Sequence, residues 1–352
     1  MSGSESLIAY RRESSSRLLF GSSWSESVRD LGPRRLLIAD ASLAKWVTET
    51  AQETGAEAVL SLPLGEAAKN LESVARVYAW LGEQKTTRDT VLVSMGGGVA
   101  TDLLGFSAAT YLRGIRWVAV STTLLGQVDA AIGGKVGVNL PFGKNLVGAF
   151  HLPDIVVLDP RFLTTLPANE WRTGLGEIIK SALIAGDPLY RQVGQLPMPG
   201  PQTLDVWQPV IREAAMLKVS IVNQDPFESG PRMFLNFGHT IAHALENLWG
   251  YGVVSHGEAV SLGTLAALRL SERVLGLDPA VRAHVEEWVR QWGLPLTLPR
   301  TVDFDALWER LHRDKKARAH GLTWVLLKQP GSPELVSGVE RELVYEAFRS
   351  IL

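Results

Sequence analysis

Histidine and carboxylate side chains in the second half of the sequence are suited to bind a divalent metal ion. His239 and His243 are spaced i, i+4 on a predicted helix, and Glu177 and Lys180 are spaced i, i+3 on an earlier one, so each pair shares a face. His256 opens a further predicted helix. Because the sequence has no cysteine, zinc would need two histidines and a carboxylate or a similar set. The histidine spacing makes His243 a candidate ligand, but it is at least as typical of core or capping histidines, and it lacks the glutamate of an H-E-x-x-H helix.

Three consecutive glycines predict a turn whose backbone can approach a ligand closely. Gly96, Gly97 and Gly98 follow a predicted strand and precede a predicted helix. Such a turn exposes N–H groups at a helix N-terminus and leaves room for a pyrophosphate. A tight turn without a ligand is an equally weighted alternative, since the G-x-G-x-x-G fingerprint is absent. Asp40 ends the first predicted strand and could bind a ribose, although for this residue alone a helix N-cap is the favoured interpretation.

A glycine-rich stretch carries charged side chains that are suited to an anionic substrate. Asp129, Lys135 and Lys144 lie in it, and Asn145 follows the second lysine. A surface loop with charged tips is the alternative, but interleaved apolar residues favour a segment drawn inward. A basic cluster over residues 312–320 is interpreted, on composition alone, as a solvated helix end rather than a phosphate or carboxylate contact.

Two kinds of segment must position these residues. In the first part of the chain, short apolar runs alternate with amphipathic ones, which predicts strands alternating with helices. The predicted strands cover residues 35–40, 57–61, 90–94, 117–120 and 155–159, and the predicted helices cover 42–54, 70–82 and 99–112. The later pattern is helical over 169–185, 209–223, 236–248, 257–275 and 279–292, with one strand candidate at 322–327. We expect an α/β, Rossmann-like N-terminal domain with a parallel doubly wound sheet (1–160) and a mainly α-helical C-terminal domain (161–352).

Composition excludes several classes of protein. The 352 residues include 35 basic and 37 acidic ones, for a formal net charge of −2. A dedicated nucleic-acid-binding protein usually has a strong basic excess, so we expect no nucleic-acid partner. The serine-rich N-terminus lacks the apolar segment of a signal peptide. No apolar run reaches the about 18 residues of a membrane span, so we expect no membrane association and a cytoplasmic location.

Taken together, the motifs resemble those of the 3-dehydroquinate synthases, members of the sugar-phosphate cyclase family. The resemblance extends in order from about residue 40 to residue 338. The matching runs are MGGGVATDLLGF (95–106), TYLRG (110–114), TTLL (122–125), QVD (127–129), GGK (133–135), GKN (143–145), GEIIK (176–180), LNFGHT (235–240), HGEAV (256–260) and DKK (314–316).

The resemblance implies a phosphate-eliminating carbon–oxygen lyase of the shikimate pathway that depends on NAD and on zinc or cobalt. The implied reaction converts a small sugar-phosphate substrate, 3-deoxy-D-arabino-heptulosonate 7-phosphate, to 3-dehydroquinate and phosphate. Its steps are transient NAD-dependent oxidation, β-elimination of phosphate, re-reduction, ring opening and intramolecular aldol closure. The alternatives are a related cyclase of the 2-deoxy-scyllo-inosose or 2-epi-5-epi-valiolone synthase type, a metal-dependent alcohol dehydrogenase, and an inactive homologue that only binds ligands.

The resemblance also implies roles for individual residues. The implied metal ligands are Glu177, His239 and His256, which leaves His243 beside the substrate as a base or phosphate partner. The implied NAD contacts are Asp40, Glu66, Lys69, Gly97, Gly98, Val99, Asp102, Thr122, Thr123, Lys144, Phe162 and Thr165. The implied substrate contacts are Asp129, Lys135, Asn145, Lys180, Lys218, Arg232, Leu235, Asn236 and one lysine of the Lys315–Lys316 pair, for which we take Lys316. The implied catalytic residues are His243, Glu228, Lys180, Lys135 and Arg113. Because the matching arginine reaches the neighbouring subunit's site, Arg113 also implies a homodimer.

Three positions depart from the family pattern. Ser121 stands where the family usually has proline, Gly126 where alanine or serine is more common, and Leu140 where histidine is common. None of these changes removes a charged group, so the expected activity is unaffected.

Overall fold

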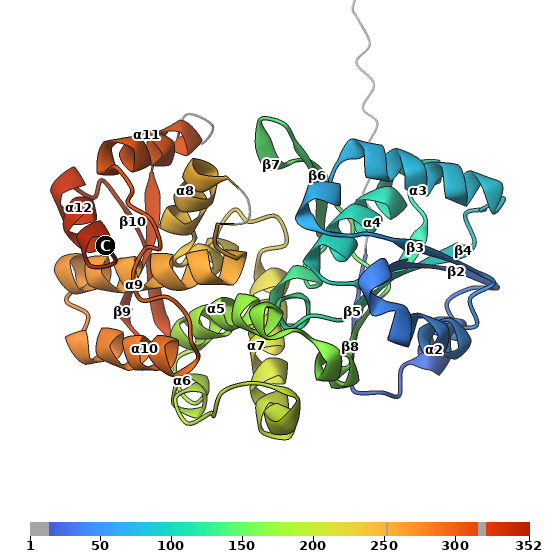
Figure 1. The fold of residues 1–352 in the computed structure, drawn as a ribbon, viewed down its shortest axis with the longest axis horizontal. Helices are drawn as coiled ribbons and strands as arrows, with labels where there is room; N and C mark the ends of the chain where they lie inside the picture. The colour runs from blue at the N-terminus through green and yellow to red at the C-terminus, as the bar shows by residue number, and fades with distance from the viewer. Residues whose placement is uncertain (1–13, 251–252, 316–321) are drawn as a thin grey trace, which may run out of the picture.

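A six-stranded parallel sheet forms the centre of the first half of the chain. The computed structural model describes residues 14–250, 253–315 and 322–352 (Figure 1). The strands lie in the order β1 (Arg17–Phe20), β8 (Ile155–Leu158), β5 (Arg116–Ser121), β4 (Thr90–Gly96), β2 (Arg34–Asp40) and β3 (Ala58–Leu62). All neighbouring pairs are parallel, and β4 is buried along its whole length, as a strand covered on both faces should be. The expected doubly wound α/β architecture is confirmed; the short edge strand β1 was not predicted.

Helices cover both faces of the sheet (Figure 1). The covering helices are α1 (Ser25–Arg29), α2 (Ala44–Thr54), α3 (Leu71–Glu83) and α4 (Gly98–Thr110). Successive strand residues point to opposite faces, so Leu36 packs in the core beneath α3 and α4, whereas Leu37 packs in the core beneath α1 and α2. The N-terminus of α4 follows β4 directly, so the glycine turn lies at the carboxyl edge of the sheet, where doubly wound folds bind ligands.

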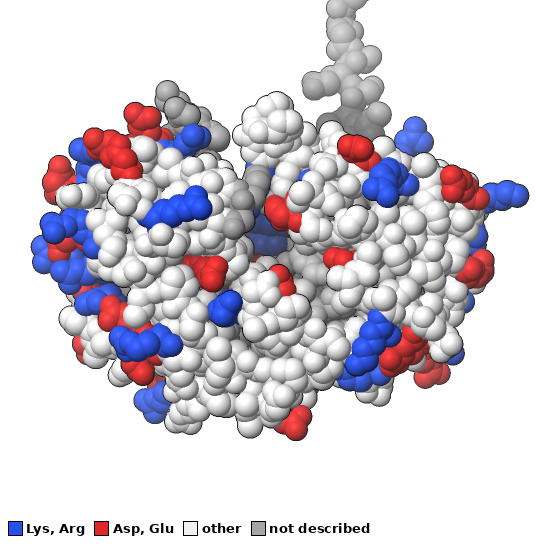
Figure 2. All heavy atoms as spheres, viewed as in Figure 1, with Lys and Arg blue, Asp and Glu red and all other residues white. Residues whose placement is uncertain are grey.

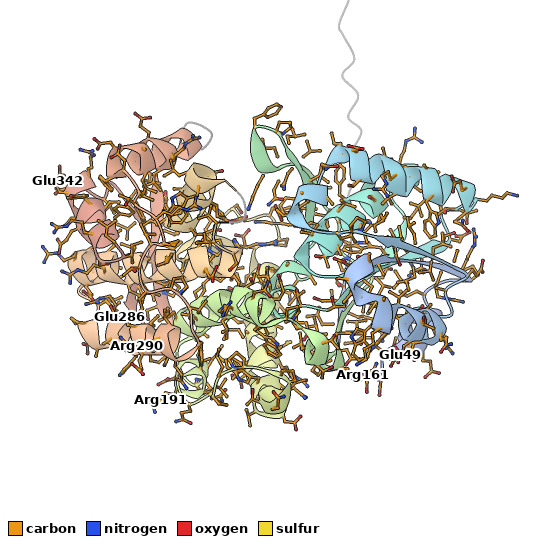
Figure 3. All side chains as sticks on the ribbon, in the orientation of Figure 1. Glu49, Arg161, Arg191, Glu286, Arg290 and Glu342 are labelled. Carbon is orange, nitrogen blue, oxygen red and sulfur yellow. The ribbon has the colours of Figure 1, made fainter. Side chains whose placement is uncertain are left out.

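A buried carboxylate fixes the chain where it leaves the sheet. Asp159, directly after β8, is fully buried and accepts hydrogen bonds from Trp24 Nε1 at 3.0 Å and from Arg161 Nε at 2.8 Å. Arg161 also pairs with Glu49 of α2 at 2.9 Å, at the lower edge of this half (Figure 3). The hydrogen bond to Asp159 raises the pKa of Arg161 above its ordinary value. This network holds the following 3-10 helix, residues 160–165, against the sheet.

The glycine-rich stretch after β5 contains an antiparallel hairpin that the sequence pattern did not predict. β6 (Lys135–Leu140) pairs with β7 (Gly143–Phe150). Gly137 and Gly148 face each other across the hairpin, and a Cβ on Gly137 would lie 2.7 Å from the carbonyl oxygen of Val147. These glycines permit the close approach of the two strands, but they also interrupt the alternation by which a strand is recognised. The hairpin projects toward the second half of the chain (Figure 1).

The second half is mainly helical, as expected, and has a single large apolar core in which Trp207 and Trp292 pack edge to face at 5.4 Å. Its elements are α5 (Ala168–Ala185), α6 (Leu189–Val193), α7 (Leu204–Gln224), α8 (His239–Trp249), α9 (His256–Leu275), α10 (Pro279–Gln291), α11 (Phe304–Lys315), β9 (Thr323–Gln329), β10 (Ser332–Ser337) and α12 (Arg341–Arg349). Of these, α6, α11, β10 and α12 were not predicted. In the described part of the chain, no helix combines the length and apolar character needed to cross a membrane.

Three of these helices cross with their backbones in contact. Where α5 meets α9, a Cβ on Gly257 would overlap with the carbonyl oxygen of Thr173, and one on Gly176 would overlap with that of Gly257. Where α8 meets α9, a Cβ on Gly263 would overlap with the carbonyl oxygen of Gly238. Because backbone carbonyls cannot swing aside as a flexible side chain can, these crossings require glycine.

We predict that Gly257→Ala lowers the free energy of unfolding by about 1–3 kcal/mol, the usual cost of an overpacked core site. Gly82→Ala in α3 is the matched control, because its Cβ would have only Tyr111 Oη nearby, at 4.0 Å. The control should be neutral or stabilising by about 0.5–1 kcal/mol, since alanine suits a helix interior better than glycine. Denaturant unfolding of both variants measures the difference, and equal stability of the two would contradict the crossing argument.

Candidate active site

Three helices bring a carboxylate and two imidazoles together in the second half. Glu177 lies in the middle of α5, while His239 and His256 are the first residues of α8 and α9. One potential ligand atom from each lies within 4.8 Å of the others, and both imidazole Nε2 atoms are 3.3 Å from Glu177 Oε1. Each of the three residues is adjacent in sequence to one of the glycines at the helix crossings, Gly176, Gly238 or Gly257. The backbone contacts therefore set the separation of the three side chains.

This set of groups fits a divalent metal ion. Glu177 is fully buried, and its two carboxylate oxygens lack a hydrogen bond of good geometry, although Lys180 forms an ion pair with one of them. A buried carboxylate that lacks hydrogen bonds is costly, and a cation between it and the imidazoles would relieve that cost. Burial alone would raise the pKa of Glu177, but Lys180 and His239 outweigh it and hold the pKa well below its ordinary value. The carboxylate is thus ionised and available as a ligand.

His243 lies next to these groups but is not part of the cluster of three. Its ring centroid is 5.3 Å from that of His239 and 6.3 Å from that of His256. Burial, followed by repulsion from His239, lowers the pKa of His243 to about 3. A cavity of about 70 Å³ is lined by His239, His243, Asn236 and Met233, among others. The i, i+4 spacing thus places His239 and His243 at one cavity, while the second histidine of the cluster, His256, comes from α9.

Two cationic side chains of the second half converge near this cluster on a carboxylate of the first half, Asp129. Lys218 Nζ of α7 lies 2.7 Å from Asp129 Oδ1, and Lys180 Nζ lies 3.7 Å from the same atom. Burial lowers the pKa of Lys218 against the opposing effect of Asp129. For Lys180, Glu177 and Asp129 outweigh burial and raise the pKa. Figure 2 shows a hollow between the two halves with basic side chains inside it.

The cationic region continues through the loop before α8. Lys135 Nζ at the start of β6 pairs with Glu228, and Asn236 Nδ2 donates to Glu228 at 2.7 Å. Glu228 adopts φ +62°, which is unusual for a residue with a side chain. Arg232 is buried and donates to the Gly133 carbonyl oxygen at 3.1 Å. Of the residues expected to contact substrate, Asp129, Lys135, Lys180, Lys218, Arg232 and Asn236 thus belong to two sets of polar contacts between the halves, and Leu235 is next to Asn236 in the chain.

The glycine turn lies in the first half, between the end of β4 and the start of α4. Gly97 is the N-terminal residue before α4, and a Cβ there would lie 2.8 Å from the Thr123 side chain. The Thr122 N–H donates to the Gly96 carbonyl oxygen at 2.9 Å, which joins the ends of β4 and β5. Val99 follows in the first turn of α4. The exposed N–H groups and the close backbone approach fit a pyrophosphate at a helix N-terminus.

A buried ion pair flanks this turn. Lys69 Nζ lies 2.6 Å from Asp102 Oδ2 and donates to Asn145 Oδ1 at 2.5 Å. Burial raises the pKa of Asp102, against the effect of Lys69. Asn145, expected among the substrate contacts, accepts this bond from Lys69, a residue of the expected NAD set.

The remaining expected NAD contacts surround the same edge of the sheet. Asp40 accepts from the Ser42 N–H at 2.9 Å, so it is the helix N-cap that its position predicted. Glu66 accepts from Asn139 Nδ2 at 2.8 Å. Thr165 Oγ1 accepts from Trp46 Nε1 at 2.8 Å, and the Trp46 ring packs against Phe162 at 5.3 Å.

Some expected site residues lie elsewhere. Arg113 is exposed on the turn after α4, at the far end of that helix from the glycine turn, with φ +64°. Lys316 lies outside the described residues. Lys144 Nζ lies 3.9 Å from Glu66 of the expected NAD set and also pairs with Glu246 of α8, at 3.0 Å. Glu246 was not among the sequence candidates, although its i, i+3 spacing from His243 could have indicated that it shares a helix face with the histidines.

Comparison with known proteins matches the chain to two family models. Residues 59–173 match the 3-dehydroquinate synthase N-terminal model, and residues 174–317 match the C-terminal model. A curated 3-dehydroquinate synthase from Rippkaea orientalis is 38% identical over 327 residues, covering 89% of this chain and 88% of the relative.

Solved structures of related cyclases share the fold. The 2-epi-5-epi-valiolone synthase from Streptomyces hygroscopicus subsp. jinggangensis, with NAD⁺ and Zn²⁺ bound, has a TM-score of 0.90 at 26% identity over 98% of each chain. A 2-deoxy-scyllo-inosose synthase complexed with carbaglucose-6-phosphate, NAD⁺ and Co²⁺ has a TM-score of 0.83 at 28% identity, covering 95% of this chain and 96% of that one.

The geometry predicts that the two histidines on α8 respond differently to substitution. His239→Ala removes one of the three clustered ligand atoms, so bound metal should be lost, whereas His243→Ala should leave near-stoichiometric metal. Elemental analysis of the purified variants measures this difference, with each variant serving as the other's control. Equal loss of metal from both would show that His243 is a ligand as well.

Proposed function

The chain belongs to the 3-dehydroquinate synthase family, and from this membership we propose that it converts 3-deoxy-D-arabino-heptulosonate 7-phosphate to 3-dehydroquinate and phosphate. The observation that supports the proposal best is the joint presence of three elements where the two halves of the chain meet. These are the Glu177, His239 and His256 cluster, the cationic side chains beside it, and the glycine turn at the end of β4. A dehydrogenase needs the first and third elements, but it does not need a cationic lining for two anionic groups.

We propose that Glu177, His239 and His256 hold a zinc or cobalt ion and that the turn at Gly97 and Gly98 holds NAD. When bound, these groups supply reversible oxidation of a substrate hydroxyl and stabilisation of its negative charge. Further residues are proposed to complete the NAD site: Asp40, Glu66, Lys69, Val99, Asp102, Thr122, Thr123, Lys144, Phe162 and Thr165. The protein's own contribution is orientation: the backbone N–H groups at the start of α4 are proposed to hold the cofactor, and the glycines at the helix crossings set the spacing of the ligands.

The substrate carries a carboxylate and a phosphate, and the cationic side chains are suited to bind both. Lys180 and Lys218 are buried and held through Asp129, so their ammonium groups are fixed before substrate arrives. Arg232 offers a planar set of donors that suits a carboxylate or phosphate. Lys135 is placed at the rim through Glu228. Fixed cations favour the developing charge of a leaving phosphate.

Elimination of phosphate also requires a proton to leave the carbon next to the oxidised one. His243 and Asn236 line the cavity beside the metal-ligand cluster, so we propose that His243 contacts the reacting part of the substrate, as a base or as a phosphate partner. Glu228 is held by Asn236 and Lys135 and is proposed to take part in proton transfer. Asn145 is proposed to serve the substrate through its amide nitrogen, since its Oδ1 accepts from Lys69. Lys316 completes the proposed substrate set.

The rival function is that of a related sugar-phosphate cyclase. The structural likeness to such a cyclase is high, with a TM-score of 0.90, but the identity is 26%, against 38% to a 3-dehydroquinate synthase over a similar share of the chain.

We propose further that the enzyme is a homodimer in which exposed Arg113 approaches the neighbouring subunit, and that its two domains cover residues 1–160 and 161–352.

We predict that the protein releases phosphate from 3-deoxy-D-arabino-heptulosonate 7-phosphate in the presence of NAD⁺ and zinc, with no net build-up of NADH. Substrate and the two products are at the same oxidation level, so any reduction of the nicotinamide must be reversed within one turnover. A phosphate assay run in parallel with absorbance at the NADH band tests this.

Glucose 6-phosphate and sedoheptulose 7-phosphate are the control substrates. Faster phosphate release from either control would assign the protein to a related cyclase. Accumulation of NADH in proportion to product would favour an alcohol dehydrogenase.

A further inference from the structure

Both histidines of the cluster present the same nitrogen to Glu177. Nε2 of His239 and Nε2 of His256 each lie 3.3 Å from Glu177 Oε1. The opposite nitrogen, Nδ1, then faces an acceptor in each case. His239 Nδ1 lies 3.2 Å from the backbone carbonyl oxygen of Phe237, and His256 Nδ1 lies 3.5 Å from Glu246 Oε1. A metal binds the Nε2 lone pair only if the proton is on Nδ1, so the partner of Nδ1 matters to binding.

Glu246 is placed to be that partner for His256. It lies two turns along α8 from His239, and its side chain is 8% exposed. Its Oε1 also accepts a hydrogen bond from Lys144 Nζ at 3.0 Å, across the hollow from β7. A buried carboxylate needs such partners to offset its loss of hydration. The Lys144 contact fixes the position of the same oxygen that faces His256.

We propose that Glu246 is the positioning residue for His256: its carboxylate accepts the Nδ1–H, fixes the tautomer and ring orientation, and so raises the affinity of the cluster for a divalent metal. The inference rests on the proposed metal site and concerns a residue outside it. Carboxylate partners of metal-bound histidines generally have this effect. The simpler alternative is that Glu246 serves only as the ion-pair partner of Lys144, holding the β6–β7 hairpin against α8.

The test compares zinc affinity across variants of the full-length protein, by competition with a chromophoric chelator. Glu246→Leu should weaken zinc binding about 10–100-fold, the usual effect of removing such a partner. Glu246→Gln should restore most of the affinity, because its amide oxygen can still accept the Nδ1–H. Lys144→Met is the matched control: it removes the ion pair but keeps the acceptor, so its zinc affinity should stay near that of the unchanged protein.

A second readout is the visible absorption of the cobalt-substituted protein, which reports ligand geometry. The spectrum should change in Glu246→Leu and stay unchanged in Lys144→Met. Circular dichroism of the metal-free variants shows whether each is folded. If Glu246→Leu does not fold, Glu246→Ala takes its place in the comparison with Glu246→Gln and Lys144→Met. Glu246→Ala also lacks the acceptor, so we expect the same loss of zinc affinity and the same change in the cobalt spectrum.

Two results would overturn the inference. One is unchanged zinc affinity in a folded variant without the carboxylate, and the other is an equal loss in Lys144→Met, which would assign the effect to the hairpin contact. His256→Ala distinguishes a failure of the proposed role of Glu246 from a failure of the proposed metal site. If His256→Ala bound zinc as tightly as the unchanged protein, His256 would not be a ligand, whatever the effect of substituting Glu246.

Discussion

The contact between helix backbones at α5, α8 and α9 is the constraint on which the candidate site depends. Glu177, His239 and His256 come from three helices, and each is adjacent to a glycine that lies at a crossing. Any side chain at those glycines would push the helices apart, and the ligand atoms would no longer lie within reach of one ion. The metal-ligand geometry is therefore encoded partly in residues that have no side chain. The apolar core of the second half, in turn, holds the crossings closed.

Charge burial is the second feature of this site. Glu177, Lys180 and Lys218 are all buried, and such groups are normally costly to the fold unless they are paired. Here the pairing is incomplete, because the oxygens of Glu177 lack hydrogen bonds of good geometry. Perturbed pKa values gathered in one hollow, lowered for Glu177 and Lys218 and raised for Lys180, are typical of functional sites. The folded protein thus retains the free-energy cost of these incompletely paired buried charges, which a bound metal ion and an anionic substrate would reduce.

Sequence reasoning predicted the central strands because buried parallel strands are continuous apolar runs, as β4 is. It missed the β6–β7 hairpin, whose facing glycines break the strand pattern, and β10, whose pairing with β9 depends on tertiary context. Helix spacing correctly placed His239 and His243 on one face, but it could not show that His256 approaches from another helix, since that depends on the crossing at Gly257. The bond between Asn145 and Lys69 likewise joins residues far apart in the chain and has no local signal.

The most direct test of this account is anomalous diffraction at the zinc absorption edge from crystals grown with zinc. We expect one strong peak among Glu177, His239 and His256, with zinc–nitrogen distances of about 2.0–2.1 Å and a zinc–oxygen distance of about 2.0–2.2 Å. A peak held by His239 and His243 without His256, or no peak among the three residues, would contradict it.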